Sequence, residues 1–449
     1  MAAAFAPVSS QQRIRNIDFL RGCAVLGILA MNIVGFAFHP SVYADPTIQG
    51  GAQGINLSTY MAAALLFDGK MRGLFTLLFG AGICLLSARA DERGASSEVA
   101  DVYYRRTLWL LLFGVAHAHL LWWGEVLYPY AVCGLMLYPF RRMSAKGLII
   151  LASVLCALLI GGASYEAHDA GEQLKKYNAA TQLKRSGARL TEEQQGDITK
   201  WEEKLKFMKP DAEALRKNHD LNTGGFLKNI KARREVLNFF HSLPLYSPML
   251  WDFLVMMLAG MALLKTGVLT GARSTAFYLK TAALGLAIGL PLHFVQLKIV
   301  LGSWFSVTAQ AWAGAVYEPA RIAMTFAYVA LGMLLVRSGV LSFLTGPLAA
   351  TGQMALTNYV MQSVCCTLVF NVFAWHGRLQ RHQVYFVVAA IWILELAWSP
   401  IWLRHFRFGP LEWAWRSLTY WKRQPFLLSA DPEPESQPAS EPSIEPQQA

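Results

Sequence analysis

Four polar side chains lie on one face of the first apolar segment, residues 13–40. They belong to Asp18, Arg21, Asn32 and His39. Because a helix advances about 100° per residue, all four fall within an arc of roughly 60°. At about 1.5 Å per residue the arc extends roughly 30 Å, close to the thickness of the hydrocarbon core. A charge that faces lipid is costly, so we expect this polar stripe to line a passage between helices from one side of a membrane to the other.

The same residues also allow a structural interpretation. Asp18 and Arg21 can pair across one helical turn and cap the segment, and Asn32 can form a hydrogen bond between helices. His39 is the member most suited to chemistry, because histidine exchanges protons near neutral pH. The alignment of all four favours a functional cavity, with His39 as a candidate catalytic base.

A second group of chemically capable residues lies in the sequence HAHLLWWGEVLYPY. It contains His117, His119 and Glu125 near the end of an apolar segment. A histidine and a carboxylate that meet can act as a base and the group that orients it, so His117 and Glu125 join His39 as candidate catalytic residues. Alternatively, His117 forms a hydrogen bond to a neighbouring helix and Glu125 lies in water at a turn.

A third group occupies the sequence GQMALTNYVMQS, residues 352–363. Asn358 and Gln362 are four residues apart and share a helical face, from which they could donate hydrogen bonds to a developing oxyanion. Amides in membrane helices also serve as packing contacts, and that alternative stays open. No metal site is expected, because the six cysteines form no C-x-x-C pair and no H-E-x-x-H sequence occurs.

The composition indicates a membrane protein. The chain has 449 residues, of which 54% are hydrophobic and 15% are charged. Several apolar runs approach the roughly 18–20 residues that cross a bilayer, which predicts an all-α, polytopic fold. The net charge of +11 comes mainly from short loops and segment ends, so it indicates orientation in a membrane and no nucleic-acid partner.

About ten transmembrane helices are predicted, in two bundles separated by an insert. The predicted spans cover residues 13–40, 71–87, 105–123, 126–140, 148–164, 248–265, 275–297, 322–336, 349–373 and 384–402. The predicted domains are an N-terminal bundle (1–164), a soluble helical insert (165–245), a C-terminal bundle (246–424) and a disordered acidic tail (425–449). Basic residues before the first span and after the last one place both termini in the cytoplasm.

The insert differs sharply in composition from the two bundles. Between Glu166 and Glu235 there are 15 Lys or Arg and 12 Asp or Glu residues. Thr191 and Gln194 have the spacing of a helix capping box, and Pro210 marks a break. We therefore expect a charged helical hairpin or lid on the extracytoplasmic side.

Several local features complete the prediction. A short amphipathic helix over residues 58–67 should bend at residues 68–70 before the second span. Three glycines in that span, Gly73, Gly80 and Gly82, should allow close helix contact. Residues 302–318 are rich in aromatic side chains and should lie at the membrane interface.

Five segments, in this order, resemble the YeiB family of bacterial inner-membrane proteins, which is classed as a domain of unknown function. They are IDFLRGCAVLGILAMNI (17–33), GKMRGLFTLLFGAGI (69–83), HAHLLWWGEVLYPYAVCGL (117–135), GQMALTNYVMQS (352–363) and WLRHFRFGPLEWAWR (402–416). The resemblance covers most of the chain except the insert and the tail. It implies a multi-pass protein of the bacterial inner membrane.

The D-x-x-R-G opening followed by an Asn is also similar to heparan-α-glucosaminide N-acetyltransferases. In those relatives, cytosolic acyl-CoA supplies an acyl group to an acceptor on the far side, and a His just after the first span takes part. His39 occupies the comparable place. This resemblance implies an acyltransferase-like fold, with acyl-CoA as the co-substrate.

The expected function is acyl transfer from cytosolic acyl-CoA to a small-molecule, glycan or lipid acceptor outside. Basic residues such as Arg105, Arg106, Arg404 and Arg407 would attract the phosphates. His117 or His39 would deprotonate the acceptor, with Glu125 orienting the base. The candidate binding residues are Asp18, Arg21, Asn32, Lys70, Arg72, Tyr130, Asn358, Tyr359 and Gln362.

Two other function classes stay open. The polar stripe could conduct a small solute, although the internal repeat common in transporters is not seen. The chain could also be a non-enzymatic lipid-binding or scaffolding protein whose insert recruits a partner. Membrane lipids are expected partners in every case, and a homodimer is left open.

Overall fold

The structure is all-helical, as predicted. The computed structural model describes residues 14–92, 99–241 and 248–428, and β-structure in these ranges is limited to one isolated bridge, between Phe406 and Leu427. The helices before the insert are α1 (Arg15–Ala37), η2 (Pro40–Tyr43), α2 (Gly54–Leu66), α3 (Lys70–Glu92), α4 (Val99–Leu120), α5 (Leu127–Leu137), η3 (Tyr138–Arg142) and α6 (Ala145–Arg185). The insert contains α7 (Glu192–Met208), α8 (Ala212–Thr223) and α9 (Phe226–His241). The remaining helices are α10 (Pro248–Lys265), α11 (Thr275–Gly302), α12 (Val307–Ser338), α13 (Ser342–Gln353), α14 (Ala355–Thr367), the π-helical η5 (Leu368–Val372), α15 (Arg381–Leu403) and α16 (Pro410–Tyr420).

Eight segments of the described chain are long and apolar enough to cross a membrane, by length and composition. The sequence predicted about ten, and the difference lies in α4 and α5, which are not among the eight. The helix α5 has 11 residues and continues directly into the 3-10 helix η3, which ends at Arg142. Residues 127–140 are thus helical as predicted, and their crossing of the membrane stays a prediction.

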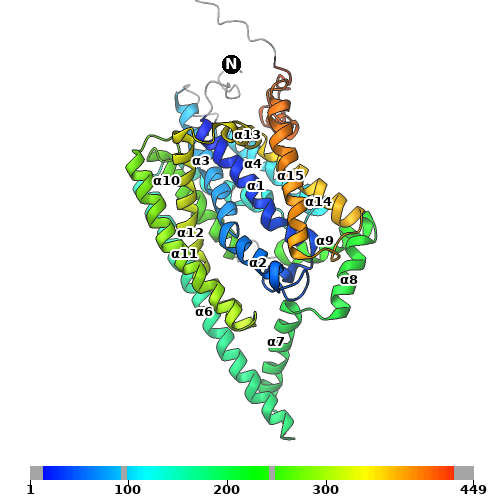
Figure 1. Ribbon diagram of the computed structural model, residues 1–449. Helices are drawn as coiled ribbons and strands as arrows, with labels where there is room; N and C mark the ends of the chain where they lie inside the picture. Colours follow the sequence, from blue (N-terminus) through cyan, green and yellow to red (C-terminus); the bar gives the residue numbers. More distant parts are fainter. Residues whose placement is uncertain (1–13, 93–98, 242–247, 429–449) are drawn as a thin grey trace, which may run out of the picture.

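The first helix lies at the centre of the bundle. Its apolar window is 78% buried inside the protein, whereas that of α6 is 11% buried. Figure 1 shows α1 running between α3, α13 and α15, with α6 and α11 at the periphery. Peripheral helices carry exposed apolar side chains such as Leu158 and Leu284, as expected for helices that face lipid.

The predicted bend between the first two apolar helices is confirmed. The helix α2 ends at Leu66 and α3 begins at Lys70. Gly69 has a φ of +70°, which a residue with a side chain adopts only at a cost. In addition, a Cβ at Gly69 would collide with Tyr317 and Arg321 of α12, so the glycine is required for both reasons.

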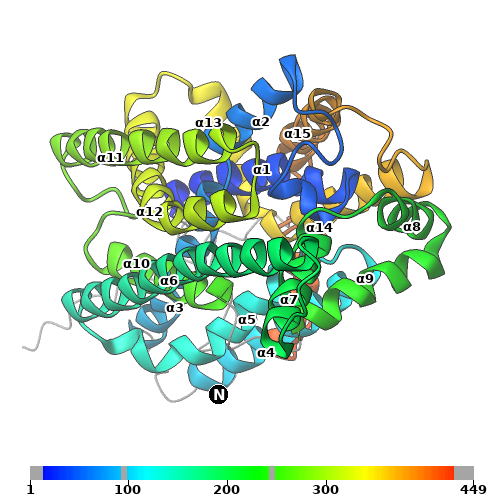
Figure 2. The ribbon, with the colours of Figure 1, turned by 90° about the horizontal axis from the view of Figure 1, so that it is seen from below.

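The insert begins without interruption from a membrane helix. The single 41-residue helix α6 continues from the predicted fifth span into the insert, and α7 folds back beside it (Figures 1 and 2). Thr191 and Gln194 form the predicted capping box, and Asp211 caps α8 after the break at Pro210. The insert is attached to the bundle by hydrogen bonds from Ser41 to the carbonyl of Phe207 and from Asn371 to that of Asn222.

One prediction near the C-terminal end needs correction, and another stays open. Residues 307–318 form the first turns of the 32-residue helix α12, which continues through Pro319, and the place of residues 302–318 at the membrane interface stays a prediction. The acidic tail does not begin at residue 425, because Phe426 and Leu427 pair with the segment around Phe406, and the ring centres of Phe406 and Phe426 lie 4.7 Å apart with the rings tilted. Residues 429–449 lie outside the described part of the chain.

Close helix contact at the predicted glycines is confirmed at Gly73 and Gly80 and is wrong for Gly82. A Cβ at Gly80 would meet the backbone of Met257 in α10, and the facing Gly260 approaches the backbone of Leu77 in the same way. At Gly82 a Cβ would find open space. Two neighbouring glycines of one helix therefore differ completely in their packing role.

We expect Gly80→Ala to lower the free energy of unfolding by about 1–3 kcal/mol, because the added methyl group overpacks the α3–α10 contact. The matched control is Gly82→Ala, which should be neutral or stabilising by up to about 1 kcal/mol because alanine favours helix. Thermal unfolding of both variants in detergent would compare them. Equal losses of stability would contradict the packing role of Gly80.

Candidate functional site

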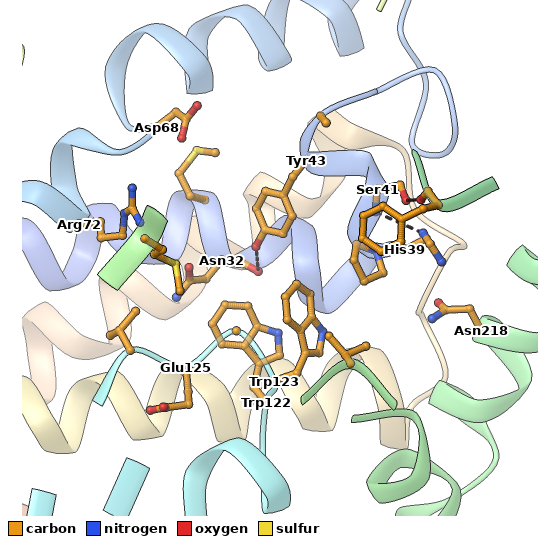
Figure 3. Close-up of a pocket in the computed structure, with 18 of the residues that line it drawn as sticks. Asn32, His39, Ser41, Tyr43, Asp68, Arg72, Trp122, Trp123, Glu125 and Asn218 are labelled. Atoms are coloured by element: carbon orange, nitrogen blue, oxygen red, sulfur yellow. Dashed lines mark hydrogen bonds between the residues drawn. The ribbon is translucent and has the colours of Figure 1, made fainter. Parts of the chain in front are cut away.

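A large cavity lies under the insert, at the end of the bundle where α1 finishes. Its volume is about 870 Å³, and we call it the insert cavity. The polar or charged residues of its wall include Asn32 and His39 from the α1 end, Asp68 and Arg72 from the α2–α3 bend, and Glu125 from the α4–α5 turn. Figure 3 shows these side chains around the cavity, with Trp122 and Trp123 beside Tyr43. Residues Lys206–Leu221 of the insert contribute the outer wall.

A second cavity lies at the other end of α1. Its volume is about 260 Å³, and we call it the α16 cavity because Glu412 to Tyr420 form part of its wall. Its charged lining consists of three arginines, Arg21, Arg106 and Arg416, and two carboxylic residues, Asp18 and Glu412. The guanidinium of Arg106 lies 4.3 Å from the centre of the Trp415 ring, a cation–π contact.

The two cavities come close to each other at the start of α5. Val126 lines the insert cavity, and the next residue, Leu127, lines the α16 cavity. Likewise Arg72 and Phe75, one turn apart on α3, face different cavities. We use the word septum for residues 125–130 and the side chains that hold them.

Three side chains fix the septum. The backbone N–H of Val126 donates to the hydroxyl of Tyr359 at 3.3 Å. The carboxyl group of Glu125 accepts hydrogen bonds from the N–H groups of Leu127 and Tyr128 at 2.7 and 2.9 Å, which caps the start of α5. The hydroxyl of Tyr130 is 2.5 Å from that of Thr76 on α3. Glu125, Tyr130 and Tyr359, separated in the sequence, therefore act on one short stretch of backbone.

The polar stripe of α1 does not line one continuous passage. Asp18 and Arg21 pair at 2.8 Å and line the α16 cavity, whereas Asn32 and His39 line the insert cavity. Val25, on the same face, is buried, and its carbonyl accepts a hydrogen bond from Gln362. The helix thus contributes one pair of polar residues to each cavity.

The candidate bases occupy three different environments. His39 lies at the rim of the insert cavity, where its Nδ1 accepts a hydrogen bond from the N–H of Ser41, and burial lowers its pKa. His117 is buried behind the septum, with Nε2 2.8 Å from the hydroxyl of Ser363 and its ring 5.1 Å from that of Tyr359. His117 lines neither cavity, and its hydrogen bond goes to Ser363, so Glu125 does not orient it as predicted.

Glu125 is in the turn between α4 and α5, outside the membrane-spanning helices. Burial raises the pKa of Glu125 to about 8, although the N–H groups of Tyr128 and Leu127 by themselves lower it. Glu125 is therefore mostly protonated at neutral pH and serves as a helix cap.

Three further candidates have packing roles in the structure. The side chain of Asn358 bonds to the carbonyl of Thr351 and to Ser399, and Gln362 donates to Val25 and Glu395. Both amides are buried between helices and line neither cavity. Lys70 is fully buried and donates from Nζ to the carbonyl of Ala64. Asn358 and Gln362 therefore have the packing role that was left open as the alternative, and Lys70 also makes a structural contact.

A buried charge network beside the insert cavity was missed by the sequence reasoning. Arg321 on α12 is fully buried and donates to Asp252 on α10 and to Glu318, the latter at 2.6 Å. Arg72 on α3 lies 3.2 Å from the other carboxylate oxygen of Asp252, and the hydroxyl of Tyr317 is 3.5 Å from Arg72. The network joins α3, α10 and α12 through two cations and two anions. Its signal in the sequence was the presence of Asp252 and Arg321 in or beside apolar segments, because charges within membrane helices are rare without a function.

No group of three or more metal-ligating side chains occurs among the residues that the structure describes.

Comparison with known proteins gives the following similarities. Residues 263–422 match the family described as "Protein of unknown function (DUF418)". The chain is 29% identical over 434 residues to "Uncharacterized protein YxaH" of Bacillus subtilis (strain 168), covering 93% of this chain and 97% of the relative. It is 28% identical over 415 residues to "Uncharacterized protein YeiB" of Escherichia coli (strain K12), covering 91% and 96%. No solved structure is significantly similar.

We expect Arg321→Gln to destabilise the fold by about 3–5 kcal/mol, because it leaves Asp252 and Glu318 buried without their shared cation. An exposed cation, Lys298 on α11, supplies the control: Lys298→Gln should change the free energy of unfolding by no more than about 0.5 kcal/mol. Denaturation of both variants in the same detergent tests this expectation. A loss for Arg321→Gln no larger than that of the control would show that the network does not stabilise the bundle.

The protonation of Glu125 can be observed directly. Infrared difference spectra across pH 6 to 10, a window chosen to bracket the pKa of about 8, should show a protonated carboxyl band that disappears with that midpoint. The band should be absent in Glu125→Gln. A band that is already lost below neutral pH would contradict the burial of this carboxyl group.

Proposed function

The chain belongs to the YeiB-like family of membrane proteins, and we propose that it is an acyltransferase that moves an acyl group from acyl-CoA in the α16 cavity to an acceptor in the insert cavity. The observation that supports this function best is that two cavities from opposite ends of α1 approach each other at the start of α5, where Val126 lines one and Leu127 lines the other. The α16 cavity is the smaller, and its wall includes three arginines beside Asp18 and Glu412. The insert cavity is the larger and is covered by the insert. Two cavities of different size at opposite ends of the protein suit a donor and an acceptor.

The α16 cavity suits the arm of acyl-CoA. Its wall includes Arg21, Arg106 and Arg416, and their guanidinium groups can attract the phosphates of acyl-CoA. At about 260 Å³ it is smaller than an ordinary ligand pocket of roughly 300–1,000 Å³, so the thioester arm would enter and the nucleotide would lie at the mouth. Of the other predicted phosphate-binding residues, Arg105 pairs instead with Asp101 at 2.8 Å, and Arg404 and Arg407 are outside the cavity wall.

The insert cavity suits the acceptor. Asn32 and Arg72 lie next to the septum and can orient a hydroxyl or amine, while the insert limits the entry of water. The hydroxyl of Tyr359, held by the N–H of Val126, keeps its own proton to donate to the oxyanion that forms on the thioester carbonyl. Tyr359 thereby takes the role that the sequence analysis gave to Asn358 and Gln362.

We place the protein in the bacterial inner membrane, with the N-terminal end of α1 and the α16 cavity on the cytoplasmic side and the insert outside. This orientation brings the basic residues near α1 and α16 to the side where acyl-CoA is made and follows the positive-inside rule. Arg381, which breaks that rule, is buried, and its guanidinium lies over the Tyr60 ring at 5.4 Å. Its role is packing within the outer end of the bundle.

Transport of a small solute is the second candidate, and one observation favours it. The cavities do not connect, as in a transporter closed between its two open states. Against it, the sequence shows no internal repeat of the kind that is common in transporters.

The test begins with purified protein and radiolabelled acetyl-CoA. An acyltransferase should bind acetyl-CoA saturably and release thiol, either by slow hydrolysis or by transfer to an added alcohol or amine. If neither binding nor thiol release occurs at any concentration, acyl transfer is excluded. Solute uptake by proteoliposomes without thiol release would favour the transporter.

We expect Arg106→Gln to weaken acetyl-CoA binding at least about tenfold, because a lost charge-assisted contact to phosphate is worth roughly 1.5–3 kcal/mol. Lys146→Gln is the control, since Lys146 is an exposed cation at the same end of the bundle and outside the cavity wall. Equilibrium binding of labelled acetyl-CoA measures both variants. Equal affinities would remove Arg106 from the binding site.

A further inference from the structure

We propose that the segments that follow α15 and α16 form a binding surface for the headgroups of anionic phospholipids. We call it the lipid surface, and it consists of the exposed residues Arg404, His405, Trp421, Lys422, Arg423, Leu427 and Leu428. None of these residues lines either cavity. The inference goes beyond the proposed function and does not depend on acyl transfer, because it concerns the contact between the protein and the bilayer around it.

The last apolar helix determines the depth of this surface. The helix α15 has 23 residues and is one of the segments that are long and apolar enough to cross a membrane. At about 1.5 Å per residue it extends roughly 34 Å, slightly more than the hydrocarbon core of about 30 Å. Arg404 and His405 follow it directly, which brings them to the level of the headgroups. Figure 1 shows α15 ending at the same end of the bundle at which α1 begins.

Two segments of the chain are joined in this surface. The backbone N–H of Leu428 donates to the carbonyl of His405 at 3.0 Å. The N–H of Arg407 donates to the carbonyl of Phe426, also at 3.0 Å. The ring centres of Phe406 and Phe426 lie 4.7 Å apart. The chain after α16 is therefore packed against the end of α15, and the exposed residues of both segments belong to one surface.

The exposed charge of these segments is positive. From residue 404 to residue 428 there are five Lys or Arg residues and one acidic residue, Glu412. Glu412 is buried, and its carboxyl group accepts hydrogen bonds from the N–H groups of Leu356 and Thr357 at 2.7 and 3.1 Å. The exposed charges between residues 404 and 428 are therefore all cations, which attract anionic headgroups at a membrane surface.

Trp421 is an independent indication of the same function. It ends α16 with a φ of +53°, in the left-handed region that favours glycine. The residue is nevertheless 68% exposed, and Leu427 and Leu428 are exposed as well. A bulky residue that strains the backbone and packs little costs stability in water, whereas tryptophan is favoured where a bilayer meets water. Trp421 and the two leucines thus suit a position among the headgroups, beside cations that bind the phosphates.

The test compares phosphatidylglycerol and phosphatidylcholine with the same acyl chains, bound to the purified full-length chain in detergent and measured by native mass spectrometry. The first variant, Lys422→Gln with Arg423→Gln, removes two cations of the lipid surface. The control, Lys184→Gln with Lys200→Gln, removes two exposed cations of the insert. The wild type and the control should both bind phosphatidylglycerol more tightly than phosphatidylcholine. The first variant should lose about fivefold of this preference for each cation, which corresponds to about 1 kcal/mol, and should bind acetyl-CoA like the wild type.

Trp421→Gly separates a role at the membrane from a role in packing. Because glycine adopts a φ of +53° without strain, this variant should unfold at a temperature no lower than that of the wild type. It should bind both lipids more weakly, because the aromatic contact with the interface is lost.

Three results would overturn the inference. The first is a wild type without preference for phosphatidylglycerol, or a preference that the Lys422→Gln, Arg423→Gln variant retains in full. The second is a lower affinity of that variant for acetyl-CoA with an unchanged lipid preference, which would assign the two cations to the acyl donor and leave the proposed function intact. The third is a Trp421→Gly variant that unfolds at a lower temperature but binds both lipids like the wild type, because Trp421 would then serve packing alone.

Discussion

The hydrogen bonds that hold the turn between α4 and α5 are the constraint on which the architecture depends. The backbone at Val126 and Leu127 separates two cavities, and because it forms the start of α5 its N–H groups have no partner within the helix. Its N–H groups are satisfied by Tyr359 and by the carboxyl group of Glu125, while Tyr130 links the next turn to α3. An unpaired N–H in such a buried place costs about 1–3 kcal/mol, so these contacts make a thin wall between two cavities stable.

The packing of the other helices holds that wall between the two ends of α1. The helix α1 passes both cavities, close glycine contacts bring α3 against α10, and the charge network ties α3 and α10 to α12. Because the network is buried, its geometry resists change, since loss of one partner leaves another charge without compensation. The insert then encloses the larger cavity from outside, through contacts such as that of His376 with Asn218 on α8. A reaction that must exclude water requires a rigid site with a cover, which here would be the helix bundle and the insert.

Much of this architecture follows from the sequence, and the reasons for the exceptions are physical. Apolar runs predicted the membrane helices, and glycine, proline and capping residues predicted the α2–α3 bend and the insert helices, because these signals act within a few residues.

The prediction failed where the outcome depends on distant partners. Nothing near residues 126–140 shows that α5 ends after 11 residues and continues as the 3-10 helix η3. The stripe on α1 was found from periodicity, but its division between two cavities depends on the side chains of α3, α5 and α14 that fill the middle. Asn358 and Gln362 looked like site residues because polar groups in a membrane helix have the same appearance in sequence whether they face a ligand or another helix.

The central claim is that the acyl donor reaches the septum from the α16 side. A cryo-EM structure with an acetyl-CoA analogue whose thioester sulfur is replaced by a non-reactive group tests this most directly. The account predicts density in the α16 cavity, phosphates near Arg106 and Arg416, and the acyl end against Leu127 and the hydroxyl of Tyr359. Density for the analogue in the insert cavity, or no density at a saturating concentration, would contradict it.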